Sequence, residues 1–313
     1  MKSPNGWESS ARSMAHVPVF ADEVMHYLDP KPGGHYVDAT ADGGGHAIEI
    51  IRAVGPTGKL LALEWDGELY KVLTQRLKTQ CSRFSKNYAL RRASYTELTR
   101  LVRSLSFGPV RGVLFDLGMR SVHLEASRRG FSFQRDEPLD MRYSREDLAE
   151  TAADILARRT AREIAEILKN FGDERFSRTI AARIVAERKR RPIRRTGDLV
   201  ALIRQAVPPP YRRGPVHVAT RTFQALRIAV NHEFENIERG LQAAAEVLAP
   251  GGRIVAVAFH YREDALIKRF FRQPAIRRAF TPLLLKPLRP GRAEVARNPR
   301  ARSALLRAYE KTA

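Results

Sequence analysis

From Pro30 onward, short apolar runs alternate with amphipathic stretches. The apolar runs have the length and composition of buried strands and cover residues 35–40, 60–65, 88–92 and 110–117. The stretches between them repeat apolar residues at helical spacing and cover residues 46–54, 66–78 and 95–105. Strands that alternate with helices form a parallel sheet with helices on its faces. The pattern therefore predicts half of a doubly wound α/β fold.

The alternation stops at about residue 137, and helical spacing without a strand pattern continues to residue 214. Helices are predicted there at 148–158, 161–171 and 176–190, before a loop rich in Pro and Gly at 208–214. The sheet pattern then resumes with a long helix at 221–248, a turn at 250–252, a strand at 253–259, a helix near 263–271 and strands near 282–286 and 303–309. We therefore predict an α/β domain of residues 16–136 plus 215–313, an inserted all-helical domain of residues 137–214, and a disordered tail of residues 1–15.

The net charge of the chain indicates what kind of partner it binds. The chain of 313 residues has 55 Lys and Arg against 34 Asp and Glu, a net charge of +21, while its apolar fraction of 43% is ordinary. Such an excess favours a polyanionic partner, RNA, DNA or an acidic membrane, over a small neutral substrate.

Other composition features narrow the compartment and the chemistry. The single cysteine, Cys81, excludes a disulfide within the chain and suits a reducing compartment. No apolar run approaches the roughly 20 residues that span a bilayer, and the first 15 residues lack the apolar stretch of a signal peptide. No cluster of Cys and His has the spacing of metal ligands. We expect a cytoplasmic protein with no membrane partner and no metal.

The densest chemical signal is a glycine-rich turn after the first predicted strand. Asp38 and Asp42 bracket this turn, which continues through Gly43, Gly44 and Gly45. A lone glycine triplet is often a plain turn, but in this fold ligands bind at the carboxyl ends of the strands. Glycines there allow close approach of a ligand to the backbone.

Two more acids end later strands. Glu64 ends the second strand, about 20 residues after the turn, where an acid can accept hydrogen bonds from ribose hydroxyls. Asp116 ends the fourth strand, where it could also serve as a helix N-cap. A dinucleotide would bring phosphates to the glycine turn, and the acids would repel them. S-adenosylmethionine carries a sulfonium and an ammonium group instead, so the acids favour it over NAD.

Several motifs then point to one family. They are HVPV at 16–19, DEV at 22–24, the turn at 38–46, RGFSF at 129–133, PLDMR at 138–142, ATRTFQALRI at 219–228 with VN at 230–231, FH at 259–260 with ED at 263–264, and NPRARS at 298–303. In order and spacing this set closely resembles the RsmH/MraW family of bacterial 16S rRNA (cytosine-N4)-methyltransferases. The resemblance covers about residues 16 to 310.

The resemblance implies a Rossmann-like class I methyltransferase that transfers a methyl group from S-adenosylmethionine to the exocyclic N4 of a cytidine in the decoding centre. Its partner would be 16S rRNA or the small ribosomal subunit. The resemblance implies as cofactor-binding residues Gly44, Gly45, His46, Glu64, Tyr95, Asp116 and His123, and the acidic turn adds Asp38.

Some positions depart from the family pattern. The family usually has Asp, Phe and Gln where Glu64, Tyr95 and His123 stand. It has DLGVSS where this chain has DLGMRS with Arg120, and FHSLEDR where this chain has FHYREDA with Tyr261. These departures concern which base is methylated, because they include positions near the expected substrate side.

The chemistry needs acceptors for the protons of the amine. The N4 lone pair is delocalised into the cytosine ring, and acceptors on its hydrogens make the nitrogen more nucleophilic. We predict Asp116, His260 and Asp140 as catalytic residues, and Cys81 as a structural one.

Two segments rich in Lys and Arg predict where the protein contacts RNA. Residues 188–213 contain nine basic residues against one acid, and residues 268–302 contain eleven against one. Such runs are often only solvated surface, but in a chain this basic they favour phosphate contact. The RNA-binding residues predicted from them are Arg190, Arg191, Arg194, Arg195, Arg212, Arg213, Arg300 and Arg302.

Two alternatives stay open at this stage. One is a non-catalytic RNA-binding or ribosome-assembly factor with the same fold, and the other is a methyltransferase that acts on a different amine. The sequence also leaves the oligomeric state open, a homodimer included.

Overall fold

The computed structural model describes residues 18–118, 123 and 127–312 of the chain. It divides into two compact units, the first of residues 1–118 and 234–313 and the second of residues 119–233. The second unit extends beyond the insertion expected at 137–214 on both sides, because Phe131 and Phe223 belong to its core. The expected tail of residues 1–15 lies outside the described residues.

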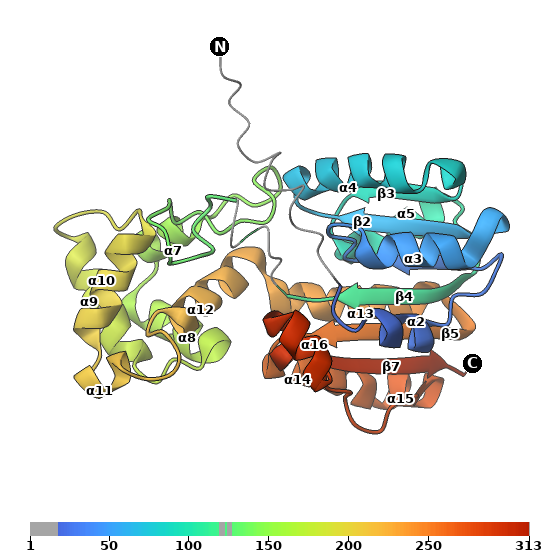
Figure 1. Ribbon diagram of the computed structural model, residues 1–313. Helices are drawn as coiled ribbons and strands as arrows, with labels where there is room; N and C mark the ends of the chain where they lie inside the picture. Colours follow the sequence, from blue (N-terminus) through green and yellow to red (C-terminus); the bar gives the residue numbers. More distant parts are fainter. Residues whose placement is uncertain (1–17, 119–122, 124–126, 313) are drawn as a thin grey trace, which may run out of the picture. The chain divides into compact units, whose positions relative to one another are not determined.

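The first unit is built on one seven-stranded sheet with the order β3-β2-β1-β4-β5-β7-β6 (Figure 1). Its strands are β1 (His35–Asp38), β2 (Lys59–Glu64), β3 (Tyr88–Arg92), β4 (Val110–Asp116), β5 (Leu248–Ala258), β6 (Phe280–Pro282) and β7 (Leu305–Lys311). The first five strands pair in parallel, and β7 pairs antiparallel with both β5 and β6. The sheet confirms the doubly wound α/β class predicted from the sequence.

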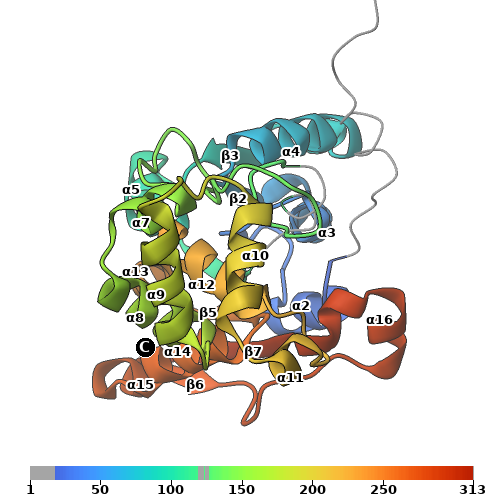
Figure 2. The ribbon, with the colours of Figure 1, turned by 90° about the vertical axis from the view of Figure 1, so that its left-hand side faces the viewer.

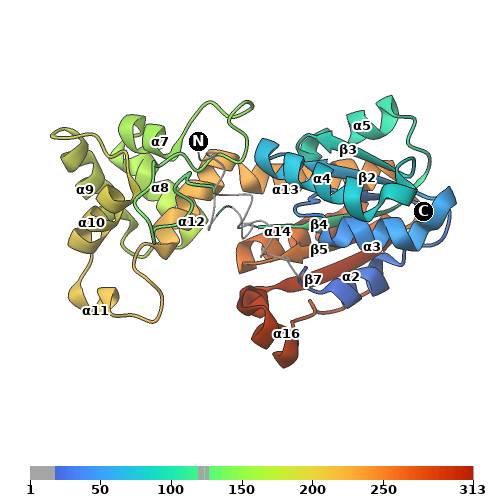
Figure 3. The ribbon, with the colours of Figure 1, turned by 45° about the horizontal axis from the view of Figure 1, so that its top comes forward.

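Helices cover both faces of this sheet. One face carries α2 (Ala21–Leu28), α3 (Gly45–Val54) and α4 (Gly67–Gln80), which share one hydrophobic cluster and lie on one side of the ribbon (Figure 3). The other face carries α5 (Leu98–Ser104), α13 (Glu233–Val247) and α14 (Tyr261–Arg272). The remaining short elements of this unit are η1 (Gly55–Thr57), η2 (Ser82–Phe84), η3 (Tyr95–Glu97), α15 (Pro274–Ala279), α16 (Arg292–Arg297) and η4 (Pro299–Ser303).

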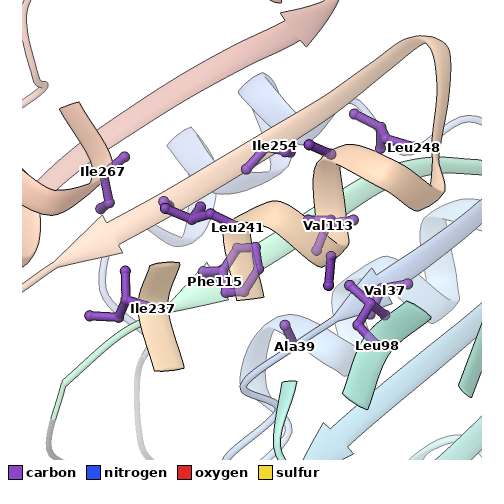
Figure 4. Packing of buried hydrophobic residues seen from close by; sticks show 14 of the residues in the cluster. Val37, Ala39, Leu98, Val113, Phe115, Ile237, Leu241, Leu248, Ile254 and Ile267 are labelled. Atoms are coloured by element: carbon purple, nitrogen blue, oxygen red, sulfur yellow. The ribbon is translucent and has the colours of Figure 1, made fainter. Parts of the chain in front are cut away.

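The packing of the second face fixes the central strands (Figure 4). Val113 and Phe115 of β4 pack with Leu98 of α5 and with Ile237 and Leu241 of α13, and all five are at most 2% exposed. Full burial of an aliphatic or aromatic side chain contributes about 1.5–3 kcal/mol. The strand ends that bear the predicted site residues therefore project from a rigid, close-packed layer.

The connection from β3 to β4 creates a topological switch point. The chain leaves β3 at one edge of the sheet and returns to place β4 on the other side of β1. In such sheets ligands bind outside the carboxyl ends of the strands that flank this point. Here a hydrogen bond joins the two strand ends, since Asp116 N donates to Thr40 Oγ1 at 2.6 Å. The fold thus brings the glycine turn after β1 beside the end of β4.

The structure corrects three element predictions. The long helix expected at 221–248 is two helices, α12 (Thr220–Asn231) and α13, because His232 between them adopts left-handed backbone with φ 50°. The strand expected at 282–286 is the earlier and shorter β6, and Leu285 is 94% exposed. The helix expected at 148–158 is the shorter α7 (Ala152–Arg158), because a capping box of Thr151 and Asp154 starts it late.

The second unit is helical (Figure 2). Besides α7 and α12 it contains α8 (Ala161–Gly172), α9 (Ser177–Arg188), α10 (Thr196–Ala206) and the short α11 (Pro209–Arg212). Ile164, Ile184 and Leu199 are fully buried in its core. Its described residues contain one isolated β-bridge, between Pro138 and Arg195, and no longer strand. The described helices of the whole chain include none that is long and apolar enough to cross a membrane.

Candidate active site

Buried acids line the carboxyl edge of the sheet at the switch point. Asp38 ends β1 and Glu64 ends β2, and each is 1% exposed. Asp116 ends β4, and its side chain is 10% exposed. The structure therefore gathers the three strand-end acids that the sequence analysis singled out in the first unit, at one edge of one sheet.

The electrostatics of this edge show that the acids repel one another. Burial raises the pKa of Asp116 well above its usual range, and repulsion from Asp38 and Glu263 raises it further. Burial also raises the pKa of Glu64, and repulsion from Asp66 and Asp38 adds to this, although hydrogen bonds from the backbone of Asp66 and Trp65 oppose it. A ligand with positive charge would relieve this repulsion, whereas a phosphate would add to it.

The glycine turn is shaped by close approach of backbone to side chains. Gly44 has φ 82°, and a Cβ there would lie 2.7 Å from Leu73 Cδ1 of α4. Arg76 Nη1 donates to the carbonyl of Gly43 at 2.5 Å and fixes the turn from the outside. Gly45 starts α3, and His46 in its first turn places Nε2 3.8 Å from Asp116 Oδ2. The turn and the end of β4 therefore form one site.

One buried atom at this edge indicates what the site accepts. Among the described residues, Asp116 Oδ1 is buried and has no hydrogen-bond partner. An ionised oxygen in that state is costly unless a donor or a cation reaches it. The ammonium and sulfonium groups of S-adenosylmethionine supply that charge, so the residues present fit this cofactor.

Tyr95 provides an aromatic wall in the same unit. It follows β3 and packs edge-on against Phe115 of β4, with ring centroids 5.6 Å apart. Gly240 of α13 makes room for it, because a Cβ there would lie 2.4 Å from Tyr95 Cδ2. The half-buried ring belongs to the layer that supports Asp116.

The end of β5 adds His260 and a residue that the sequence analysis did not select. His260 caps α14, where its Nδ1 accepts from Glu263 N at 3.4 Å. Glu263 is fully buried, accepts from Phe259 N at 2.7 Å, and places Oε1 3.1 Å from His260 Nε2. The signal for Glu263 was its place three residues after His260, the spacing of a capping box. Glu263 also repels Asp116, so His260 and Asp116 belong to the same edge.

Two predicted site residues lie in the second unit and are not placed relative to the edge of the sheet. His123 is 1% exposed and stacks on Phe131 and Tyr143 at 4.9 and 4.8 Å. Asp140 accepts from Arg142 Nε at 2.7 Å and from Arg145 Nε at 3.1 Å. Burial alone would raise the pKa of Asp140, but the hydrogen bonds from Arg142 and the nearby guanidinium charges lower it. Arg120, a noted departure, lies outside the described residues.

A buried asparagine holds the loop that contains Asp140. Asn231 Nδ2 donates to Met141 O at 2.7 Å and to Arg227 O at 2.8 Å, and its Oδ1 accepts from Tyr143 N at 2.7 Å. Met141 has left-handed backbone with φ 61°. Arg227 in turn forms a buried pair with Glu233, with Nε 2.7 Å from Oε1. The VN and PLDMR motifs thus meet in one hydrogen-bonded cluster.

The predicted RNA-binding arginines are all exposed, but their side chains differ in pairing. Arg191 pairs with Glu187 at 2.9 Å, Arg195 pairs with Asp136 at 2.5 Å, and Arg212 Nη2 donates to Val207 O at 3.0 Å. Arg300 also has a partner. Within the described part of the chain, four have side chains without a hydrogen bond or ion pair: Arg190, Arg194, Arg213 and Arg302.

The fold and this site define a class. A doubly wound sheet whose switch point holds buried acids, a glycine turn and an aromatic wall is that of a Rossmann-like methyltransferase dependent on S-adenosylmethionine. The family comparison agrees, since the model of the MraW methylase family matches residues 13–312. The chain belongs to this family.

Curated relatives cover nearly the whole chain. One from Thermomicrobium roseum is 42% identical over 96% of this chain and 95% of its own length, and one from Methylococcus capsulatus is 43% identical over 93% and 99%. Both are named ribosomal RNA small subunit methyltransferase H. A solved structure of an rRNA methylase from Streptococcus thermophilus is 13% identical, covers 94% of each chain and has a TM-score of 0.44.

No cluster of three or more potential metal ligands occurs among residues 18–118, 123 and 127–312.

Proposed function

We propose that this protein transfers a methyl group from S-adenosylmethionine to the exocyclic N4 of a cytidine in the decoding centre of small-subunit rRNA. The observation that carries the proposal is the buried acidic edge at the switch point, with Asp116 Oδ1 left for a ligand. The names of the curated relatives support rRNA of the small subunit as the substrate. The N4 position rests on the resemblance of the sequence motifs.

The residues that would hold the cofactor come from four successive strand ends. Gly44, Gly45 and His46 would border its amino-acid part, with Asp38 and Asp116 close to its positive charges. Glu64 would accept from the ribose hydroxyls, and Tyr95 would flank the adenine. His123 stays a predicted contact from the second unit. When bound, the cofactor supplies an electrophilic methyl group that needs no metal.

The protein's own task is to take a proton from the amine. Asp116 suits it because a buried carboxylate with a raised pKa binds a proton more strongly than an exposed one. His260 stays a prediction, because its Nδ1 accepts from Glu263 N at 3.4 Å and its Nε2 lies 3.1 Å from Glu263 Oε1, so both ring nitrogens face Glu263. Asp140 stays a prediction, and its two guanidinium partners and lowered pKa favour a role in holding its loop over a role as a base.

Methylation of small-subunit RNA with purified protein tests this proposal. The RNA would be incubated with isotopically labelled S-adenosylmethionine, digested and analysed by nucleoside mass spectrometry. We expect labelled N4-methylcytidine with the wild type and at least a hundredfold less with Asp116→Asn. Label on another nucleoside would favour the different-amine alternative, and cofactor binding without turnover on naked RNA or on subunits would favour the non-catalytic one.

We propose that the second unit contacts RNA through arginines that have no acidic partner among the described residues. Arg190 and Arg194 are exposed and lack an acidic partner among the described residues, unlike Arg191 and Arg195. Each phosphate contact contributes about 0.7–0.9 to the slope of log affinity against log salt. The double change of Arg190 and Arg194 to Ala should therefore reduce this slope by about 1 to 2.

A matched pair in the same unit controls for the loss of charge. Arg158 and Arg162 are exposed but pair with Asp154 at 3.5 Å and with Glu166 at 2.9 Å. Their double change to Ala removes the same formal charge and should leave the slope nearly unaltered. Equal slopes for both double variants would show that Arg190 and Arg194 are only solvated surface.

A further inference from the structure

Tyr261 is an exposed aromatic side chain at the edge of the sheet that bears the site. Its side chain is 60% exposed. Every other aromatic side chain in residues 18–118 and 127–312 is buried or half-buried. Exposed apolar side chains are often tolerated singly, but a lone exposed ring beside an active site calls for a reason.

The position of Tyr261 is fixed by its neighbours in the first unit. It is the first residue of α14 and follows His260 directly. Phe259, two residues before Tyr261, packs on the loop after β4, since a Cβ on Gly118 would lie 2.9 Å from Phe259 Cδ2. In the sheet, Asp116 pairs with Val257 of β5. Tyr261 therefore stands at the same edge as Asp116 and His260, and its side chain is exposed to solvent.

The fold itself gives no reason for an aromatic residue there. His260 and Glu263 make the capping box that starts α14, and neither of its two hydrogen bonds involves the side chain of Tyr261. The face of the Tyr261 ring is approached by the guanidinium of Arg262, with Cζ 5.5 Å from the ring centroid. An aromatic face next to a guanidinium is the chemistry that binds an unpaired base and its adjoining phosphate.

We propose that Tyr261 is a stacking platform for an unpaired base of the RNA strand, adjacent to the base that is methylated. The inference rests on the proposed function, because it requires RNA at this edge. The acids that hold the cofactor are buried, whereas Tyr261 is exposed, so the base that stacks on it lies outside the cofactor site. Arg262 then lies where it can contact the phosphate next to that base.

Substitutions at Tyr261 separate ring stacking from apolar area. Tyr261→Leu keeps apolar area without a π face, and Tyr261→Phe keeps the face without the hydroxyl. Removal of one base–aromatic stack weakens binding by about 5- to 150-fold. We expect Tyr261→Leu to raise the Kd for a fluorescein-labelled oligoribonucleotide around the target by about tenfold, measured by anisotropy, and Tyr261→Phe to raise it far less. The matched control is Leu285→Ser, at the other large apolar side chain that is exposed among the described residues of this unit, and this variant should bind RNA like the wild type.

A second readout reports stacking itself. An oligoribonucleotide with 2-aminopurine next to the target cytidine should lose fluorescence on binding the wild type and lose much less on binding Tyr261→Leu. Isothermal titration of S-adenosylmethionine should give the same Kd for both proteins, because Tyr261 lies outside the cofactor site.

The outcomes separate the two proposals. A wild type that binds the cofactor but labels no cytidine would defeat the proposed function, whatever Tyr261 does. A wild type that methylates cytidine, with Tyr261→Leu equal to it in Kd and in 2-aminopurine quenching, would overturn only the stacking inference. Loss of cofactor binding in Tyr261→Leu would overturn it too, because the ring would then support the pocket rather than the RNA.

Discussion

Replacement of Asp116 by Asn should make the protein more stable and less active at once. Asp116 Oδ1 is buried without a hydrogen-bond partner among the described residues, and the neighbouring Asp38 and Glu263 carry the same charge. Asn has nearly the same shape and no charge. The variant therefore removes the repulsion without leaving a cavity.

The size of the effect follows from the burial. A buried polar group without a partner costs about 1–3 kcal/mol, and a charged one costs more. We therefore expect Asp116→Asn to raise the free energy of unfolding at pH 8 by about 1–3 kcal/mol. In a unit of about 200 residues, each kcal/mol raises Tm by roughly 2–4 °C. The Tm should rise by about 2–12 °C.

The stability gained by Asp116→Asn should increase as the pH rises. Because the pKa of Asp116 is raised in the fold, the folded protein holds this proton more tightly than the unfolded chain does. The cost of ionisation is absent below the usual carboxyl range, grows as the pH rises towards the raised pKa, and is constant above it. The Tm difference between variant and wild type should therefore be small at pH 4 and reach its full size at higher pH.

Scanning fluorimetry across this pH range, with and without S-adenosylmethionine, measures both effects. The cofactor should raise the Tm of the wild type and hardly that of the variant, since loss of a charge-assisted hydrogen bond of about 1.5–3 kcal/mol weakens binding roughly 10- to 150-fold. Asp136→Asn is the control, because its pKa is lowered by Arg195 and its exposed carboxylate is already compensated. A lower Tm for Asp116→Asn without cofactor would refute the reasoning.

Three further predictions concern the glycine turn after β1 and the buried hydrogen-bonded cluster of the second unit. Gly44→Ala should destabilise the first unit by about 1–2 kcal/mol in urea and weaken cofactor binding in calorimetry, because φ is 82° and the new Cβ meets Leu73 at 2.7 Å. Asn231→Ala should lower the free energy of unfolding by about 2–4 kcal/mol in urea, since Met141 O and Tyr143 N of the second unit lose the side chain that they bond to; an unchanged midpoint would contradict this. Glu233→Gln should lower the free energy of unfolding by about 3–5 kcal/mol because the buried Arg227 loses the carboxylate charge with which it pairs, and a double change of the pair to apolar residues should recover most of that loss.

Local patterns in the sequence predicted most of the sheet. The runs at 35–40, 60–65 and 110–117 became β1, β2 and β4, because buried parallel strands need continuous apolar residues. The run at 88–92 became β3, the half-buried strand at the edge of the sheet. The same patterns failed where a single backbone angle decided the outcome. Helical spacing is continuous through residue 232, and only the left-handed His232 divides α12 from α13.

By itself the sequence determined the fold class, the three acids at strand ends and the basic character of the chain, since each depends on residue type and local order. Tertiary structure decided which of these groups interact. The crossover from β3 to β4 brought Asp38 beside Asp116, and the pairing of β4 with β5 brought the end of β5, with Glu263, to the same edge. Tertiary structure also paired Arg195 with Asp136, which lies 59 residues earlier in the chain. The reason is physical: burial and charge pairing depend on distances between residues far apart in the chain, and no local pattern encodes such distances.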